Sequence, residues 1–123
     1  MKEKKFDLDE RLIDFAVDII FFTESLPNTK AANHLGGQLL RSGTSPSLNY
    51  GEVKGAESQK DFVHKMKVCL KELRESYNCS RILRKAKLFI SEETIDSLIG
   101  ECNELISIFV KSIHTASNSK SNS

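Results

Sequence analysis

Apolar residues recur at spacings of three and four positions along most of this sequence. In the first such segment, residues 8–25, the repeating residues are Leu8, Leu12, Phe15, Ile19 and Phe22. This spacing places apolar side chains on one face of an α-helix, whereas a half-buried strand requires strict alternation. The pattern therefore predicts an all-α fold. Pro27 ends the first helix, because proline disfavours the helical conformation in the residue before it.

Three further segments, residues 31–54, 58–87 and 91–114, carry the same periodicity. The first of them contains Pro46, which removes a backbone donor and clashes with the preceding turn, so we expect a kink near residues 42–44. Small residues surround this proline and predict the close approach of another helix. They are Ser42, Gly43, Thr44, Ser45 and Ser47.

Capping signals mark the starts of the last two helices. Ser58 precedes Asp61 by three residues, a variant of the capping box. Ser91 precedes two glutamates, whose charge suits the positive end of the helix dipole. Residues 115–123 are mostly Ser, Asn and Lys, which predicts a disordered tail.

Four amphipathic helices with short links predict an antiparallel up-down-up-down four-helix bundle over residues 1–114. A chain of 123 residues suits one domain with one hydrophobic core. The apolar faces of the first and fourth helices are wide, and a wide apolar face on a small bundle favours self-association.

The sequence predicts a cytoplasmic protein. No stretch approaches the roughly 20 apolar residues that a membrane span needs. Residues 1–10 mix lysines with acids and lack the apolar core of a signal peptide. Cys69, Cys79 and Cys102 are odd in number and follow no C-x-x-C spacing, which is typical of reduced thiols.

No pattern in the sequence indicates an enzyme. There is no phosphate-binding glycine motif, and Gly36-Gly37 is too sparse for a dinucleotide fingerprint. His34, His64 and His114 lie on three different segments, without an H-E-x-x-H motif or cysteines at ligand spacing. We therefore expect no catalytic residue, no metal site and no cofactor.

The positive charge is concentrated in one part of the chain. The formal net charge is only +1, but residues 52–87 carry ten Lys/Arg against five Asp/Glu. On the third helix, six cations fall at spacings that place them on one face. They are Lys60, Lys67, Lys71, Arg74, Arg81 and Lys85. A basic stripe of this kind is expected for a protein that binds a phosphate backbone.

The alternative interpretation of this stripe is an ordinary solvated helix face. In that case Glu72 and Glu75 pair with Lys71 and Arg74. No aromatic residues alternate with the cations, so any binding should rest on backbone contacts and have little sequence preference.

Several motifs resemble those of the bacterial four helix bundle protein family, and their ordered match spans residues 39–75. They are Leu39-Leu-Arg-Ser-Gly-Thr-Ser45, Asn49-Tyr-Gly-Glu52, Gly55-Ala-Glu-Ser-Gln-Lys-Asp-Phe62 and Leu70-Lys-Glu-Leu-Arg-Glu75. The founding members of this family are encoded in intervening sequences of 23S ribosomal RNA genes. The accessory protein of diversity-generating retroelements is a relative.

The resemblance implies a four-helix bundle that assembles as a homopentameric barrel. It also implies nucleic-acid binding, because the retroelement relative is strongly basic and binds nucleic acid and its reverse transcriptase. This chain departs from that relative in its net charge of only +1. Two hypotheses follow: an accessory protein that binds the backbone of RNA or DNA, or a protein-interaction scaffold that binds no nucleic acid.

The polar residues of these motifs suggest a structural role. Arg41, Asn49 and Glu52 surround Pro46, where they can satisfy backbone groups that a kink frees. Alternatively, Arg41 and Glu52 meet Asp61 or Glu72 of a neighbouring helix in a polar network at a subunit interface. The full set of such residues is Arg41, Ser45, Asn49, Glu52, Asp61 and Glu72.

Overall fold

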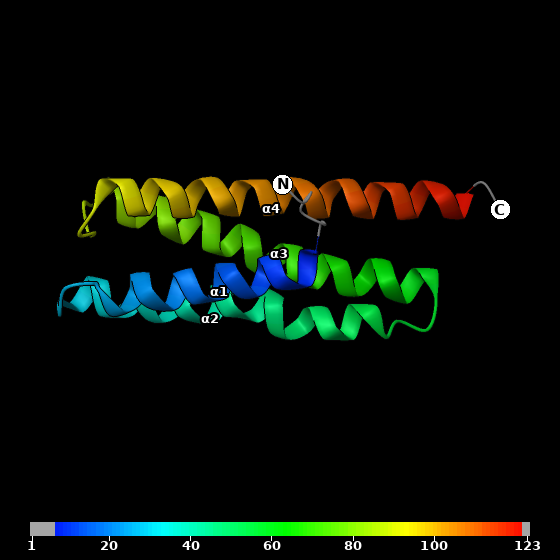
Figure 1. The fold of residues 1–123 in the computed structure, drawn as a ribbon, viewed down its shortest axis with the longest axis horizontal. Helices are drawn as coiled ribbons and strands as arrows, with labels where there is room; N and C mark the ends of the chain where they lie inside the picture. Colours follow the sequence, from blue (N-terminus) through cyan, green and yellow to red (C-terminus); the bar gives the residue numbers. More distant parts are fainter. Residues whose placement is uncertain (1–6, 122–123) are drawn as a thin grey trace, which may run out of the picture.

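The computed structural model describes residues 7–121 of the chain, and it is built from four α-helices (Figure 1). These are α1 (Leu8–Glu24), α2 (Lys30–Lys54), α3 (Gln59–Lys85) and α4 (Glu92–Ser121). Short links join them, so consecutive helices run antiparallel, which confirms the predicted all-α bundle. No helix among the described residues combines the length and the apolarity that a membrane crossing requires.

The helices form a ring in which each contacts two neighbours. The α2–α3 and α3–α4 pairs pack most extensively, and the α1–α4 pair packs least. α1 and α3 lie diagonally across the bundle, as do α2 and α4, and these diagonal pairs meet only through side chains in the core, as the rings of Tyr50 and Phe109 do with centroids 6.2 Å apart. One face of α3 therefore points into solvent on the side of the bundle away from α1.

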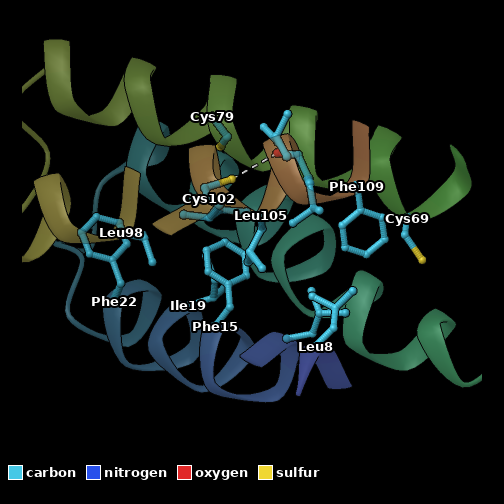
Figure 2. Close-up of a cluster of buried hydrophobic side chains, with 14 of the residues drawn as sticks. Leu8, Phe15, Ile19, Phe22, Cys69, Cys79, Leu98, Cys102, Leu105 and Phe109 are labelled. Carbon is cyan, nitrogen blue, oxygen red and sulfur yellow. Dashed lines mark hydrogen bonds between the residues drawn. The ribbon is translucent and has the colours of Figure 1, made fainter. Parts of the chain in front are cut away.

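The predicted apolar face of α1 forms part of the core. Leu12, Phe15, Ile19 and Phe22 are almost completely buried and belong to one cluster with residues of α3 and α4. Figure 2 shows Phe15, Ile19 and Phe22 in this cluster. Leu105 and Phe109 of α4 lie in the same cluster (Figure 2). Burying a side chain of this size contributes about 1.5–3 kcal/mol, so this cluster is the main source of stability.

Side-chain caps begin the helices where the sequence predicts them. The Ser58 hydroxyl accepts a hydrogen bond from the Asp61 amide at 3.0 Å, and Ser91 accepts one from the Thr94 amide at 3.2 Å. Thr29 caps α2 in the same way. Each cap satisfies a backbone donor that the helix leaves open and contributes about 1 kcal/mol.

The helix α2 runs through Pro46, which is buried inside it. Hydroxyl groups just before the proline bond to carbonyls one turn earlier: Thr44 Oγ1 donates to Leu40 O at 2.7 Å, and Ser45 Oγ donates to Arg41 O at 2.6 Å. These bonds occupy the two hydroxyls within α2 itself, as is usual for Ser and Thr inside helices.

The small residues of α2 allow both neighbouring helices to approach, as the sequence predicts. A Cβ atom placed on Gly43 would lie only 2.6 Å from Cγ1 of Ile19 on α1. On the other side, the Ser42 and Ser76 hydroxyls lie 2.8 Å apart and join α2 to α3 in the core. The segment therefore fixes two helix crossings at once.

The prediction of a disordered tail over residues 115–123 needs correction. α4 does not end near residue 114 but continues to Ser121, while residues 122 and 123 lie outside the described part of the chain. Ala116 is buried against the bundle, and the side-chain amide of Gln59 donates a hydrogen bond to its carbonyl oxygen. These contacts hold the polar end of α4 against the start of α3.

The α1–α2 crossing can be tested with glycine substitutions. We expect Gly43→Ala to lower the free energy of unfolding by about 1–2 kcal/mol. Overpacking against Ile19 costs about 1–3 kcal/mol, and the better helix propensity of alanine offsets up to about 1 kcal/mol of that. Urea unfolding followed by circular dichroism measures the change.

Gly37→Ala is the matched control, because Gly37 lies in the same helix with nothing within 4 Å of the added Cβ. It should raise stability by about 0.5–1 kcal/mol. In an Ile19→Ala background, Gly43→Ala should lose its destabilising effect. If Gly43→Ala stabilises the protein as the control does, the helices are not held in close contact at Gly43.

Candidate nucleic-acid interface

The six predicted cations of α3 share one exposed face of the helix. We call this set the α3 stripe: Lys60, Lys67, Lys71, Arg74, Arg81 and Lys85. The buried residues of the same helix, such as Met66, Leu73 and Leu83, lie on the opposite side. The amphipathic pattern thus turns the apolar side of α3 toward the core and the stripe toward solvent.

The stripe is as long as one turn of a nucleic-acid duplex. Lys60 and Lys85 are separated by 25 positions of a continuous helix, which corresponds to about 37 Å at 1.5 Å per residue. One turn of duplex spans about 34–36 Å. The cations are therefore spread over enough length to meet several phosphates along one side of a duplex.

The two acids beside the stripe are engaged by another helix. Nη1 of Arg41 on α2 lies 3.1 Å from Oε1 of Glu72, and Nη2 of Arg41 pairs with Glu75. The pKa of Arg41 is raised, mainly by its hydrogen bond to Glu75 and next by its hydrogen bond to Glu72. The ion pairs of the alternative interpretation, from Glu72 and Glu75 to Lys71 and Arg74, are therefore not formed.

Other acids near α3 pair with cations outside the stripe. Arg84 lies 2.7 Å from both Glu92 and Asp96 of α4, measured between nitrogen and oxygen. Lys65 Nζ lies 2.8 Å from Asp61 Oδ2. Within residues 7–121, none of the six cations of the α3 stripe forms a salt bridge. α3 thus has paired cations on its flanks and unpaired cations on its outer face.

One member of the stripe has an aromatic neighbour. The Arg81 guanidinium carbon lies 5.7 Å from the centre of the Tyr77 ring. Tyr77 is half-buried and packs against the core, so its ring supports the arginine and does not project among the cations. The Tyr77 ring is therefore not placed to stack on a base.

The structure distinguishes between the roles predicted for the motif residues. One hypothesis placed Arg41 against Glu72 at a subunit interface. Arg41 does bond to Glu72, but within the same chain, so its guanidinium is directed to α3.

Asp61 and Asn49 have different surroundings. The Asp61 carboxylate pairs with Lys65 and also accepts a hydrogen bond from the Glu57 amide at 3.1 Å, and these two bonds lower the pKa of Asp61. Asn49 and Glu52 form no hydrogen bond or salt bridge with any described residue.

The three cysteines are buried and free. Cys102 Sγ lies 3.2 Å from the Leu73 carbonyl oxygen (Figure 2), and Cys79 Sγ lies 3.3 Å from that of Leu35. Burial raises the pKa of Cys69 and Cys79 to about 11 and that of Cys102 to about 12. The thiolate needed for nucleophilic attack is therefore scarce at neutral pH.

Sequence reasoning missed two features of the surface. It proposed that Arg41 meets Asp61 or Glu72 at a subunit interface, but not that Arg41 pairs with Glu72 and Glu75 of its own chain, although the i,i+3 spacing of these two acids on one flank of α3 was a signal. It also missed a cleft between α1 and the start of α4, whose lining includes Phe21 and Ile90. The only sequence signal for that cleft was the presence of large apolar residues, such as Phe21, close to the end of α1.

Comparison with known proteins identifies relatives of known fold. The model of the family described as 23S rRNA-intervening sequence protein matches residues 4–111. A crystal structure of a protein of unknown function from the S23 ribosomal protein family of Bacteroides thetaiotaomicron VPI-5482 is similar, with a TM-score of 0.79 and 28% sequence identity. The similarity covers 87% of this chain and 98% of that one. A comparison with curated proteins finds no match.

The buried thiols lead to a prediction about reactivity. We expect Ellman's reagent to modify Cys69, Cys79 and Cys102 in the native protein far more slowly than an exposed thiol at pH 7. Burial raises the pKa of all three thiols, and the reagent reaches them only when the bundle opens locally. In urea all three thiols should react at once.

A Ser117→Cys variant provides the matched control, because Ser117 is exposed on the same helix as Cys102. It should add one rapidly reacting thiol under native conditions. Rapid native reaction of the three natural thiols would contradict their inertness.

Proposed function

This chain belongs to the 23S rRNA-intervening sequence protein family, and on that basis we propose that it is a nucleic-acid-binding accessory protein. Its binding surface is the α3 stripe, which contacts the phosphate backbone of RNA or DNA. One observation carries the proposal: six exposed cations extend over about 37 Å without a salt bridge, because Arg41 engages the adjacent acids.

Binding of this kind is driven by counterion release. Each phosphate that a cation neutralises frees a condensed counterion, so affinity falls with salt in proportion to the number of contacts. Six cations limit the slope of log affinity against log salt to about −5 per chain for a duplex. Without stacking side chains, the higher charge density of a duplex favours it over a single strand.

The rest of the surface directs the polynucleotide to α3. α1 carries five acids against the single cation Arg11, and residues 88–123 carry five acids against two lysines. Because α1 lies diagonally across the bundle from α3, the five acids of α1 are remote from the stripe, and four of the five acids of α4 pair with arginines outside the stripe. A low net charge is thus compatible with one strongly basic face.

We propose that the protein also assembles with itself. Ile13, Val17 and Ile20 lie on one face of α1 at i, i+4 and i+7 spacing, and all three are exposed. An apolar row of this kind suits contact with a second copy. In a homo-oligomer such as a pentamer, several α3 stripes act on one polynucleotide, and their combined affinity exceeds that of one chain.

A protein-interaction scaffold is the second candidate function. Leu48 on α2 is among the most exposed large apolar residues, outside the α1 row. An exposed apolar residue of this size is a feature of surfaces that contact other proteins. The scaffold predicts indifference to polynucleotide at every salt concentration.

The binding surface can be tested by fluorescence anisotropy with labelled single- and double-stranded RNA and DNA. We expect binding at low salt that weakens steeply between about 50 and 200 mM. The variant Lys67→Glu/Lys71→Glu should reduce affinity at least about tenfold and flatten the salt slope by about 2, because two phosphate contacts become repulsive.

The variant Lys30→Glu/Lys111→Glu changes the net charge equally but lies off the stripe, so it should retain most of the affinity. Arg41→Ala should weaken binding, because Glu72 and Glu75 are then free to pair with stripe cations. Equal losses in both double variants would show that overall charge, and not the stripe, determines binding. No binding at the lowest salt would remove the accessory function and favour the scaffold.

Self-assembly can be tested by light scattering coupled to size-exclusion chromatography. We expect the native chain to form a homo-oligomer, and Ile13→Ser/Val17→Ser to shift it toward monomer because the apolar contact is lost. Val110→Ser on α4 is the control, since Val110 is exposed to a similar extent outside the α1 row. A native chain that is monomeric at tens of micromolar concentration contradicts the proposal.

A further inference from the structure

A cleft lies at the end of the bundle where α1 finishes and α4 begins. Its volume is about 500 Å³, within the range of sites that hold ligands or peptide side chains. Phe22 and Leu98, which are buried side by side (Figure 2), form its floor. The cleft is open because α1 and α4 pack less extensively than the other neighbouring helices, and because the small side chains of Ser25 and Ser97 line it.

Large apolar side chains border the cleft and remain in contact with water. Phe21 is 70% exposed and Ile90 is 75% exposed, although both line the same hollow. The core does not need either of them, because Phe22 already fills the adjacent position inside the bundle. An exposed apolar border around an apolar floor is typical of a surface that buries a side chain of another molecule.

The polar part of the cleft is acidic. Asp18 and Glu93 line it, and no lysine or arginine within residues 7–121 does. The pKa of Asp18 is raised by desolvation and by the nearby charges of Asp14 and Glu101, and Asp18 forms no salt bridge with any described residue. Its carboxylate therefore lacks a compensating cation.

The arginines on this side of the bundle are already engaged. Arg11 is held by Glu101 at 2.7 Å and by Glu104, while Arg84 is held by Glu92 and Asp96. Neither guanidinium lines the cleft. A cation that neutralises Asp18 must therefore come from the bound molecule.

We propose that this cleft binds a segment of a partner protein that carries a bulky apolar side chain next to a lysine or arginine. The apolar side chain lies between Phe21 and Ile90 on the floor of Phe22 and Leu98. The adjacent cation pairs with Asp18, and Glu93 supplies a second negative charge at the entrance. The hydroxyls of Ser91, Thr94 and Ser97 are available to the backbone of the segment.

The position of the cleft separates it from the α3 stripe. The cleft is built by the end of α1 and the start of α4, and α1 lies diagonally across the bundle from α3. Its negative charge repels a polynucleotide, so the two surfaces select ligands of opposite charge. One chain can therefore hold a nucleic acid and a basic segment of a partner protein at the same time. This inference does not depend on whether the stripe binds nucleic acid.

The test is a titration of the isotope-labelled full chain with short capped peptides, followed by amide chemical shifts. The first peptide combines phenylalanine and leucine with lysines. The second replaces the lysines by glutamates, and the third replaces the apolar residues by alanine. We expect saturable shifts at Phe22, Thr94 and Ser97 with the first peptide, and at least about tenfold weaker binding of the other two.

Two substitutions in the cleft, each with a control, identify the contacts. Phe21→Ser and Asp18→Asn should each weaken the first peptide about tenfold, and both change exposed side chains that the fold does not require. Val110→Ser is the control for loss of an exposed apolar residue outside the cleft, and Glu10→Gln is the control for loss of a negative charge on α1. Both controls should bind the peptide as the native chain does.

Three results would overturn the proposal. The first is an absence of saturable shifts at the cleft with the basic apolar peptide at millimolar concentration. The second is equal affinity for the acidic peptide, which would mean that Asp18 and Glu93 do not select the ligand. The third is a change of the cleft amides on dilution of the protein alone, together with a change in light scattering, which would identify a second copy as the occupant.

Discussion

The close packing of α2 against both of its neighbours determines the arrangement of the other helices. Gly43 admits Ile19 of α1 at a distance that any larger residue would block, and Ser42 bonds to Ser76 of α3 on the adjacent side. With α3 held in this register, Arg41 reaches Glu72 and Glu75. Three consecutive residues of α2 thus connect the packing of the core to the charge of the outer face of α3.

The ring arrangement keeps surfaces of opposite charge apart. α3 turns its unpaired cations outward on one side, while the acids of α1 lie diagonally across the bundle and Glu92 and Asp96 of α4 are paired with Arg84. A net charge of +1 therefore says little about what the protein binds, because the field near each face depends on local charges within about one Debye length. The stripe and the cleft are properties of faces, not of composition.

The fold was largely predictable from the sequence, because apolar periodicity and capping residues are local signals. Ser58 and Ser91 mark helix starts, and the exposure of the stripe follows from spacing alone. The partner of Glu72 depends on the register of α2 against α3, which no local pattern encodes. The end of α4 was missed because one alanine and the distant Gln59 outweigh the polar composition of the segment.

The weak contact between α1 and α4 has a consequence for how the chain folds. Among the described residues, it is the one pair of helices whose backbones pack side by side without being consecutive in the sequence, and it is the least extensive such pair. Most of the native contacts therefore join segments close along the chain, so the contact order is low, and proteins of this topology fold within microseconds to milliseconds. Bringing α1 and α4 together closes the longest loop, which costs the most conformational entropy, and forms the least extensive helix pair. We therefore expect this step to be the last event of folding.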